Sequence, residues 1–138
     1  HGDDRRQRQM CIRDRDYRPD FTAKETGLDA FINWDKEFIG KKYAKEDNSV
    51  NKLTPMVVET NEIDVTYNEA VLKDDKAIGY VTSGGFAHFV NKSVAFSYLD
   101  TNKLNSGKGI QVEINGDLFN CNLIKEPLYD PSGSKMRS

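Results

Sequence analysis

Few side chains in this 138-residue chain could act as nucleophiles, since it has two cysteines and two histidines. Outside residues 1–15, only Cys121 and His88 remain of these types. A cysteine beside a histidine could form a nucleophile and its general base. Cys121, however, alternates with Phe119 and Leu123 on the apolar side of a predicted strand, where a free cysteine packs as a small hydrophobic residue. We therefore expect Cys121 to be inert, and His88 to pack in a loop or to line a site.

A glycine-rich segment, residues 79–84, has the six-residue frame of a phosphate-binding loop. Gly85 and Phe86 stand where that loop requires lysine followed by serine or threonine. The segment also lies between predicted strands, with no helix N-terminus to hold an anion. This excludes a phosphate loop, and we expect the glycines to permit a sharp bend or the close approach of another segment.

The acidic residues show no catalytic or metal-binding pattern. No two carboxylates have the spacing of metal or glycosidic chemistry, and Asp74-Asp75 is typical of a hairpin turn. The two cysteines and two histidines make neither a structural zinc site nor a disulfide-dense scaffold. The sequence therefore predicts no metal site and no self-contained catalytic centre.

The charge is unevenly spread, although 20 basic and 22 acidic residues leave a net charge of only -2. Five of the seven arginines lie in residues 1–15. Residues 5–15, Arg-Arg-Gln-Arg-Gln-Met-Cys-Ile-Arg-Asp-Arg, resemble a translated sequencing adapter joined in frame to a gene. We expect residues 1–15 to be an artefactual disordered leader; a genuine disordered terminus is the alternative. Neither interpretation supports nucleic-acid binding.

Hydropathy predicts a globular protein with no membrane segment. No apolar run approaches the ~20 residues that a membrane-spanning helix needs. The N-terminus lacks the apolar region of a secretory signal. We expect a cytoplasmic location.

The segment from residue 16 to 47 reads as helical. Thr22 and Glu25 have capping-box spacing, and Leu28 begins a short apolar stripe at helical spacing. The acidic residues Asp35 and Glu37 indicate a second helix start, which Gly40 would weaken. The sequence thus predicts a short helical region before the strands.

Residues 69–126 read as antiparallel strands with turn signals between them. Alternation at 78–82 and 94–98 predicts two strands, and Pro55 within an apolar run predicts an edge strand or a strand start. Asn115-Gly116 predicts a two-residue hairpin turn. That turn sets Val112 opposite Phe119 and Ile110 opposite Cys121. The pattern favours a mainly β fold, a small antiparallel barrel or sandwich.

Two motif blocks connect this pattern to a known family. Residues 78–86 read Ile-Gly-Tyr-Val-Thr-Ser-Gly-Gly-Phe, and residues 91–99 read Asn-Lys-Ser-Val-Ala-Phe-Ser-Tyr-Leu. In this order they resemble the C-terminal barrel of the glycine-cleavage T-protein (aminomethyltransferase) family, whose pattern is G-x-V-T-S-G-G, a short gap, then G-K-S-x-A-x-x-Y. Asn91 stands where that family usually has glycine. Segments 25–29 and 35–41 are similar to the end of the family's folate-binding domain.

The C-terminal segment narrows the resemblance. Residues 126–131, Glu-Pro-Leu-Tyr-Asp-Pro, resemble the end of dimethylglycine and sarcosine dehydrogenases. In those enzymes a flavin domain oxidises an N-methyl amine, and a T-protein-like module passes the one-carbon unit to tetrahydrofolate. The resemblance implies a parent enzyme that uses tetrahydrofolate, FAD on a domain missing here, and a small N-methylated amine. It also implies the mitochondrial matrix if the source is eukaryotic.

The resemblance further implies that this chain is a fragment. The family's catalytic aspartate belongs to sequence upstream of that present here, and the chain would be inactive alone. We expect four parts, namely a leader (1–15), the remnant of the folate-binding domain (16–50), the barrel (51–131) and a tail (132–138). The remnant would normally pack against the rest of the missing domain.

Five residues are candidates for the mouth of the folate site that the resemblance implies: Thr82, Ser83, Gly84, Gly85 and His88. The alternative for them is a tight barrel corner. For the whole chain, three alternatives stay open. It could derive from a standalone aminomethyltransferase or from a related folate-dependent demethylase of a sulfonium substrate, or it could be a noncatalytic structural or binding barrel.

Overall fold

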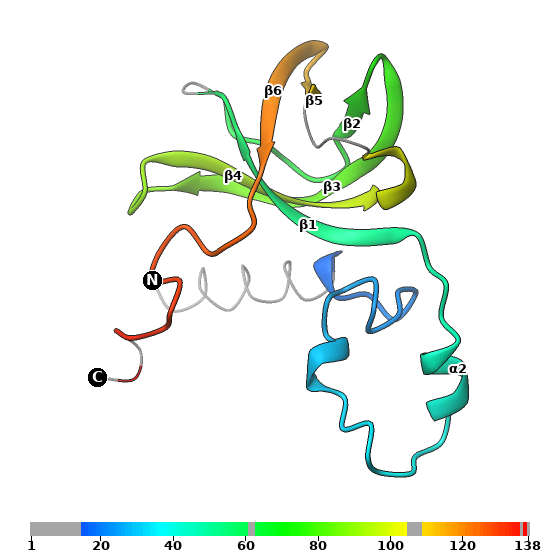
Figure 1. The fold of residues 1–138 in the computed structure, drawn as a ribbon. Helices are drawn as coiled ribbons and strands as arrows, with labels where there is room; N and C mark the ends of the chain where they lie inside the picture. Colours follow the sequence, from blue (N-terminus) through cyan, green and yellow to red (C-terminus); the bar gives the residue numbers. More distant parts are fainter. Residues whose placement is uncertain (1–14, 61–62, 105–108, 136, 138) are drawn as a thin grey trace.

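Six antiparallel strands close into a barrel. The computed structural model describes residues 15–60, 63–104, 109–135 and 137, and within them the strand order around the barrel is β1-β4-β3-β2-β5-β6 (Figure 1). The strands are β1 (Asn51–Val58), β2 (Ala70–Lys73), β3 (Lys76–Ala87), β4 (Lys92–Asp100), β5 (Ile110–Ile114) and β6 (Asp117–Leu123). The predicted mainly β fold is confirmed, as a barrel and not a sandwich.

Two hairpins form where the turn residues predict them. Asn115 and Gly116 have φ values of 53° and 91°, as a type I′ turn requires. β5 and β6 therefore pair with Val112 opposite Phe119 and Ile110 opposite Cys121, the predicted register. Asp74-Asp75 likewise makes the tight turn between β2 and β3, with φ values of 49° and 60°.

The barrel interior holds the hydrophobic core. Alternate residues of the strands point inward, so that β5 has the burial pattern of a strand with one face in the core. The buried cluster consists of Met56, Val58, Val65, Val71, Ile78, Val81, Ala95, Leu99, Ile110, Val112, Ile114 and Cys121.

The strand that contains Pro55 is not an edge strand, contrary to the prediction. β1 pairs with β4 along its whole length and with β6 over Met56–Val58, because the sheet closes on itself. Pro55 lies at the point where the β6 pairing ends, and its carbonyl accepts from the N–H of Ile124 at 2.9 Å. A proline is tolerated there because one side of β1 is unpaired before that point.

The helices predicted for residues 22–32 are mostly absent. The capping-box contacts do form, since Thr22 N–H donates to Glu25 Oε2 at 2.9 Å and Glu25 N–H donates to Thr22 Oγ1 at 3.2 Å. They close only a turn, because Gly27 follows with a φ of 73°. The helix that does form within residues 22–32 is a short 3-10 turn, η1 (Asp29–Phe31).

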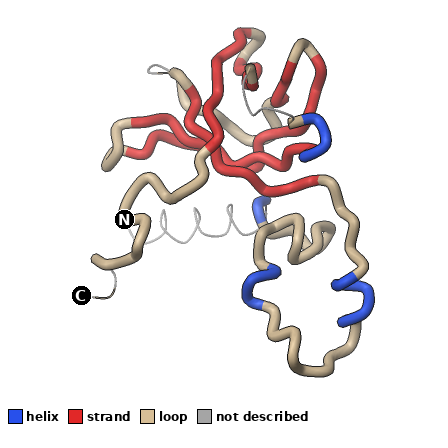
Figure 2. The backbone as a smooth tube through the Cα atoms, in the orientation of Figure 1, coloured by secondary structure: helices blue, strands red, loops and turns tan. Residues whose placement is uncertain are grey.

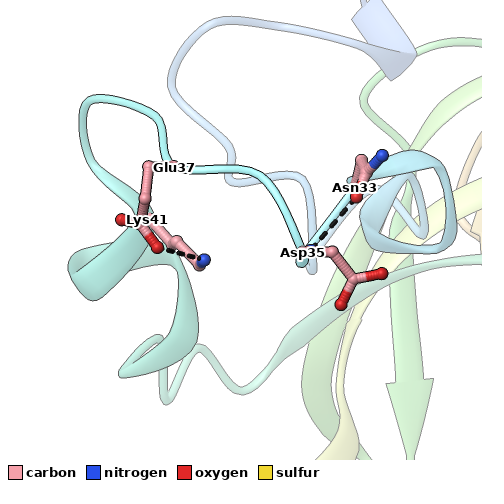
Figure 3. A network of polar contacts seen from close by, with 4 residues as sticks. All are labelled: Asn33, Asp35, Glu37 and Lys41. Atoms are coloured by element: carbon pink, nitrogen blue, oxygen red, sulfur yellow. Dashed lines mark hydrogen bonds and ion pairs between the residues drawn. The ribbon is translucent and has the colours of Figure 1, made fainter.

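The second predicted helix is also displaced. It begins as α2 (Lys41–Lys45), and Gly40 precedes it with a φ of 89°, so the glycine caps the helix instead of lying within it. The chain between η1 and α2 is a loop that extends away from the barrel (Figure 2). Local contacts support it, with Lys41 Nζ on Glu37 at 2.7 Å and the Asp35 N–H on Asn33 at 3.1 Å (Figure 3).

Two further observations concern the ends of the chain and its hydropathy. Of the predicted leader, residues 1–14 lie outside the described part of the chain. Arg15 is described, with its guanidinium 4.5 Å from the centroid of the Tyr67 ring. No helix among the described residues is both long enough and apolar enough to cross a membrane.

Candidate functional site

The five residues predicted for the site mouth lie in the second half of β3 and in the turn after it. Val81 pairs with Ser97 and Ser83 pairs with Phe96, so Thr82 is an extra residue and forms a bulge. Thr82 is fully buried and Ser83 is partly buried. The bulge agrees with the barrel-corner interpretation of these two residues.

Both hydroxyl groups at the bulge contact one carboxylate. Thr82 Oγ1 donates to Asp16 Oδ1, and Ser83 Oγ donates to Asp16 Oδ2 at 2.9 Å. Tyr98 Oη on β4 donates to the backbone carbonyl of Asp16 at 2.6 Å. Asp16 is 2% exposed, so its carboxylate exchanges water for the hydroxyl donors of Thr82 and Ser83.

The segment that follows Asp16 lies along the same part of the barrel. The Phe21 ring stacks on the Tyr98 ring with 3.7 Å between centroids. Further on, the carbonyl of Glu25 accepts from the N–H of Leu53 at 2.7 Å, near the start of β1. Residues 16–25 are therefore held against the barrel at three positions, Asp16, Phe21 and Glu25.

The other three predicted residues do not join this cluster. A Cβ on Gly84 would lie 2.5 Å from the carbonyl oxygen of Val65, so the close approach expected for the glycines occurs here. Gly85 has no neighbour within 4 Å of such a Cβ. His88 is exposed in the β3–β4 turn, with its ring 5.0 Å from that of Phe86. Five residues of β3, 83–87, separate His88 from Thr82.

Sequence reasoning missed Asp16, Phe21 and Tyr98 as members of this cluster. Sixty-six positions separate Asp16 from Thr82, and no periodicity connects residues so far apart. The one available signal was the adjacent hydroxyl pair of Thr82 and Ser83 in a strand, where side chains of opposite polarity usually alternate.

The electrostatics of the barrel agree with the expected inertness of Cys121. Burial raises the pKa of the Cys121 thiol to about 12, and the thiol donates to the Phe119 carbonyl at 3.6 Å. The thiol therefore stays protonated at neutral pH and is a poor nucleophile. Burial also raises the pKa values of Tyr80 and Tyr98, so both phenols remain donors.

Two hollows on the described surface are lined by residues other than the five predicted for the site mouth. One lies in the N-terminal segment, where Lys24, Trp34, Tyr43, Lys45 and Asp47 contribute to its wall. A second, mostly apolar, runs between the outer face of β4 and residues 124–129. No group of three or more histidine, cysteine, aspartate or glutamate side chains in the described ranges could hold a metal ion.

Comparison with known proteins gives the family. Residues 51–130 match the family model of the glycine cleavage T-protein C-terminal barrel domain, and these residues comprise β1 to β6. The chain belongs to this family. The resemblance expected from the two motif blocks is confirmed.

Two groups of curated proteins are similar to this chain over most of its length. It is 32% identical to mitochondrial dimethylglycine dehydrogenase of Mus musculus over 125 residues, which is 86% of this chain and 14% of that protein. It is 30% identical to an aminomethyltransferase of Thermosipho melanesiensis over 111 residues, which is 78% of this chain and 30% of that protein. The T-protein barrel thus spans only a small part of these relatives.

A solved structure supports the same fold. The glycine cleavage system aminomethyltransferase T of Bartonella henselae superposes with a TM-score of 0.72 and 21% identity, covering 82% of this chain and 33% of that one. Because the match extends beyond the 80 residues of the family domain, part of the segment before β1 also follows that fold.

Proposed function

We propose that this chain is the C-terminal part of a tetrahydrofolate-dependent one-carbon-transfer enzyme, and that it lacks the catalytic centre. Membership of the T-protein barrel family carries this proposal. It is supported by the coverage of the relatives, because the chain spans only 14% of the mouse dimethylglycine dehydrogenase and 30% of the Thermosipho aminomethyltransferase. The chemistry would then belong to the folate-binding domain that precedes the barrel.

Within that class, we favour an FAD-dependent dimethylglycine or sarcosine dehydrogenase as the parent. The higher identity to the dimethylglycine dehydrogenases, over 86% of the chain, favours this subclass. A standalone aminomethyltransferase is the second candidate, because relatives of that kind match at 30% identity. A flavin would be bound by a domain outside this chain, and the location would be the cytoplasm or, in a eukaryote, the mitochondrial matrix.

The role we propose for the barrel is to close over the folate-binding domain. Residues 16–50 would pack on the remainder of that domain. The mouth of the folate site would be bordered by Thr82, Ser83, Gly84 and Gly85 on β3 and by His88 in the turn after it. Exposed apolar side chains on this segment support a missing partner surface, with Phe31 85% exposed and Ile39 fully exposed.

Reading the gene upstream of residue 16 separates the two parents. We expect a folate-binding domain in either case, and additionally a G-x-G-x-x-G dinucleotide fingerprint after a strand if the parent is the flavin enzyme. An upstream region with a folate-binding domain alone would favour the standalone aminomethyltransferase. An upstream region with neither would contradict the proposed function.

A further inference from the structure

Three hydroxyl groups on β3 and β4 converge on a single residue that precedes the barrel by more than thirty positions in the chain. We propose that Thr82 and Ser83 form a carboxylate-binding slot in the barrel wall, which the Asp16 side chain fills while Tyr98 binds the Asp16 backbone. The residues that form the slot belong to the barrel, and the slot fixes the segment around Asp16, which precedes β1. It rests on the contacts described above and does not depend on the folate proposal.

The bulge in β3 builds this slot. Adjacent residues of a regular strand point to opposite faces of a sheet, so Thr82 and Ser83 could not both reach one group. The register shift between Val81 and Ser83 re-aims one of the two side chains. As a result their hydroxyls meet different oxygens of the same carboxylate, Oδ1 and Oδ2.

The chemistry of the slot selects a carboxylate. Two hydroxyl donors directed at two oxygens match a planar group that accepts on both sides. Thr82, Tyr98 and Asp16 are all at most 2% exposed, so the carboxylate has lost its water and needs hydroxyl donors to offset its desolvation. Thr82 Oγ1 also lies 3.1 Å from the carbonyl oxygen of Phe96, so its hydroxyl keeps an acceptor when the carboxylate is absent. The third donor, Tyr98 Oη, binds the backbone of Asp16 and so fixes the segment that brings the carboxylate in.

The slot could bind either a carboxylate side chain of the protein or a small free carboxylate. Asp16→Ala removes the side-chain carboxylate and leaves room for formate, the smallest molecule with that group. We expect Asp16→Ala to have a lower Tm than the parent chain, and formate to raise that Tm in a saturable manner by binding the folded state. Chloride at equal ionic strength should not raise it, and neither salt should have a saturable effect on the parent chain.

A matched variant separates the slot from a general salt effect. Adding Ser83→Ala to Asp16→Ala removes one donor from the slot, and we expect this double variant to lose most of the formate response. Thr54→Ala in the Asp16→Ala background is the control, because Thr54 is half-buried on β1 and its hydroxyl donates to the carbonyl of Lys52, away from the slot. The control should keep the full response.

If Asp16→Ala proves unfolded, the same titration still decides the matter. Recovery of the folded circular dichroism signal on adding formate, and not chloride, would support the slot. A response to formate that equals the response to chloride, or that survives loss of the Ser83 hydroxyl, would overturn the proposal.

Discussion

Single residues on β3 are constrained by contacts that only the folded chain provides. Thr82 and Ser83 bind the Asp16 carboxylate through a bulge, and two residues later Gly84 lies against the backbone of Val65. These three residues, which look like one motif in the sequence, therefore perform at least two separate tasks. One task is to hold the segment around Asp16 against the barrel. The other is to leave room for the backbone at Val65, in the segment before β2, to pass close to β3.

Substitution at Gly84 should be much more costly than at its neighbour. A Cβ at Gly84 would lie 2.5 Å from the Val65 carbonyl oxygen, whereas at Gly85 it would meet nothing within 4 Å. We expect Gly84→Ala to lower the free energy of unfolding by about 1–3 kcal/mol because neighbouring backbone must move. Gly85→Ala is the matched control and should change stability little. Denaturant unfolding followed by far-ultraviolet circular dichroism measures both, and equal effects would contradict the packing described.

The buried thiol of Cys121 should make stability depend on alkaline pH. Burial raises its pKa from 9.0 to about 12, so the folded state holds the proton over this interval while the unfolded chain releases it. Stability from this group is therefore complete below pH 9 and is lost as the pH rises towards 12. In a Cys11→Ser background, we expect unfolding to become easier above pH 9 relative to a Cys121→Val variant. Parallel pH profiles for the two proteins would show that the thiol is not buried in this way.

Among the elements, short-range signals predicted the barrel well and the N-terminal segment poorly. The β5–β6 register follows from Asn115-Gly116 alone, because a two-residue turn fixes which residues face each other. The predicted helices are largely absent because Gly27 and Gly40 adopt positive φ. These glycines interrupt the helix that the spacing of apolar residues alone would predict. The Asp16 cluster could not be predicted, since its partners lie on β3 and β4 and meet only when the barrel closes.

The β5–β6 turn should tolerate alanine poorly at its second position. Gly116 has a φ of 91°, in the region that side-chain-bearing residues avoid. We expect Gly116→Ala to destabilise the chain by about 1–2 kcal/mol. Gly116→Asn should recover part of that loss, because asparagine tolerates positive φ better than alanine does. Equal losses of unfolding free energy for the alanine and asparagine variants would contradict a type I′ turn at Asn115-Gly116.

The segment from residue 28 to 46 should open more readily than the barrel. Neither η1 nor α2 contains a buried residue, whereas Val112 and Ile114 on β5 are at most 1% exposed. We expect amide hydrogen exchange at 28–46 to be faster than at 110–121 under native conditions. Uniform protection would instead mean that the segment packs as firmly as the barrel without a preceding domain.

At the scale of the whole molecule, this chain covers only a small part of the length of the relatives it matches. The chain spans 14% of the length of the mouse dimethylglycine dehydrogenase and 30% of the Thermosipho aminomethyltransferase. The segment before β1 exposes apolar side chains, and it is fixed to the barrel wall at Asp16. We propose on this basis that the reaction centre and most of the folate site lie in the preceding domain.

The most direct test of the proposed function is calorimetric titration of the full-length parent protein with 5-formyltetrahydrofolate, alongside residues 16–138. We expect the parent to bind this tetrahydrofolate analogue with micromolar affinity and the present chain to show no heat of binding. Binding by the parent alone would place the folate site upstream, as proposed. A parent that is folded but does not bind the analogue would contradict a tetrahydrofolate-dependent enzyme, and micromolar binding by residues 16–138 alone would contradict the upstream location of the site.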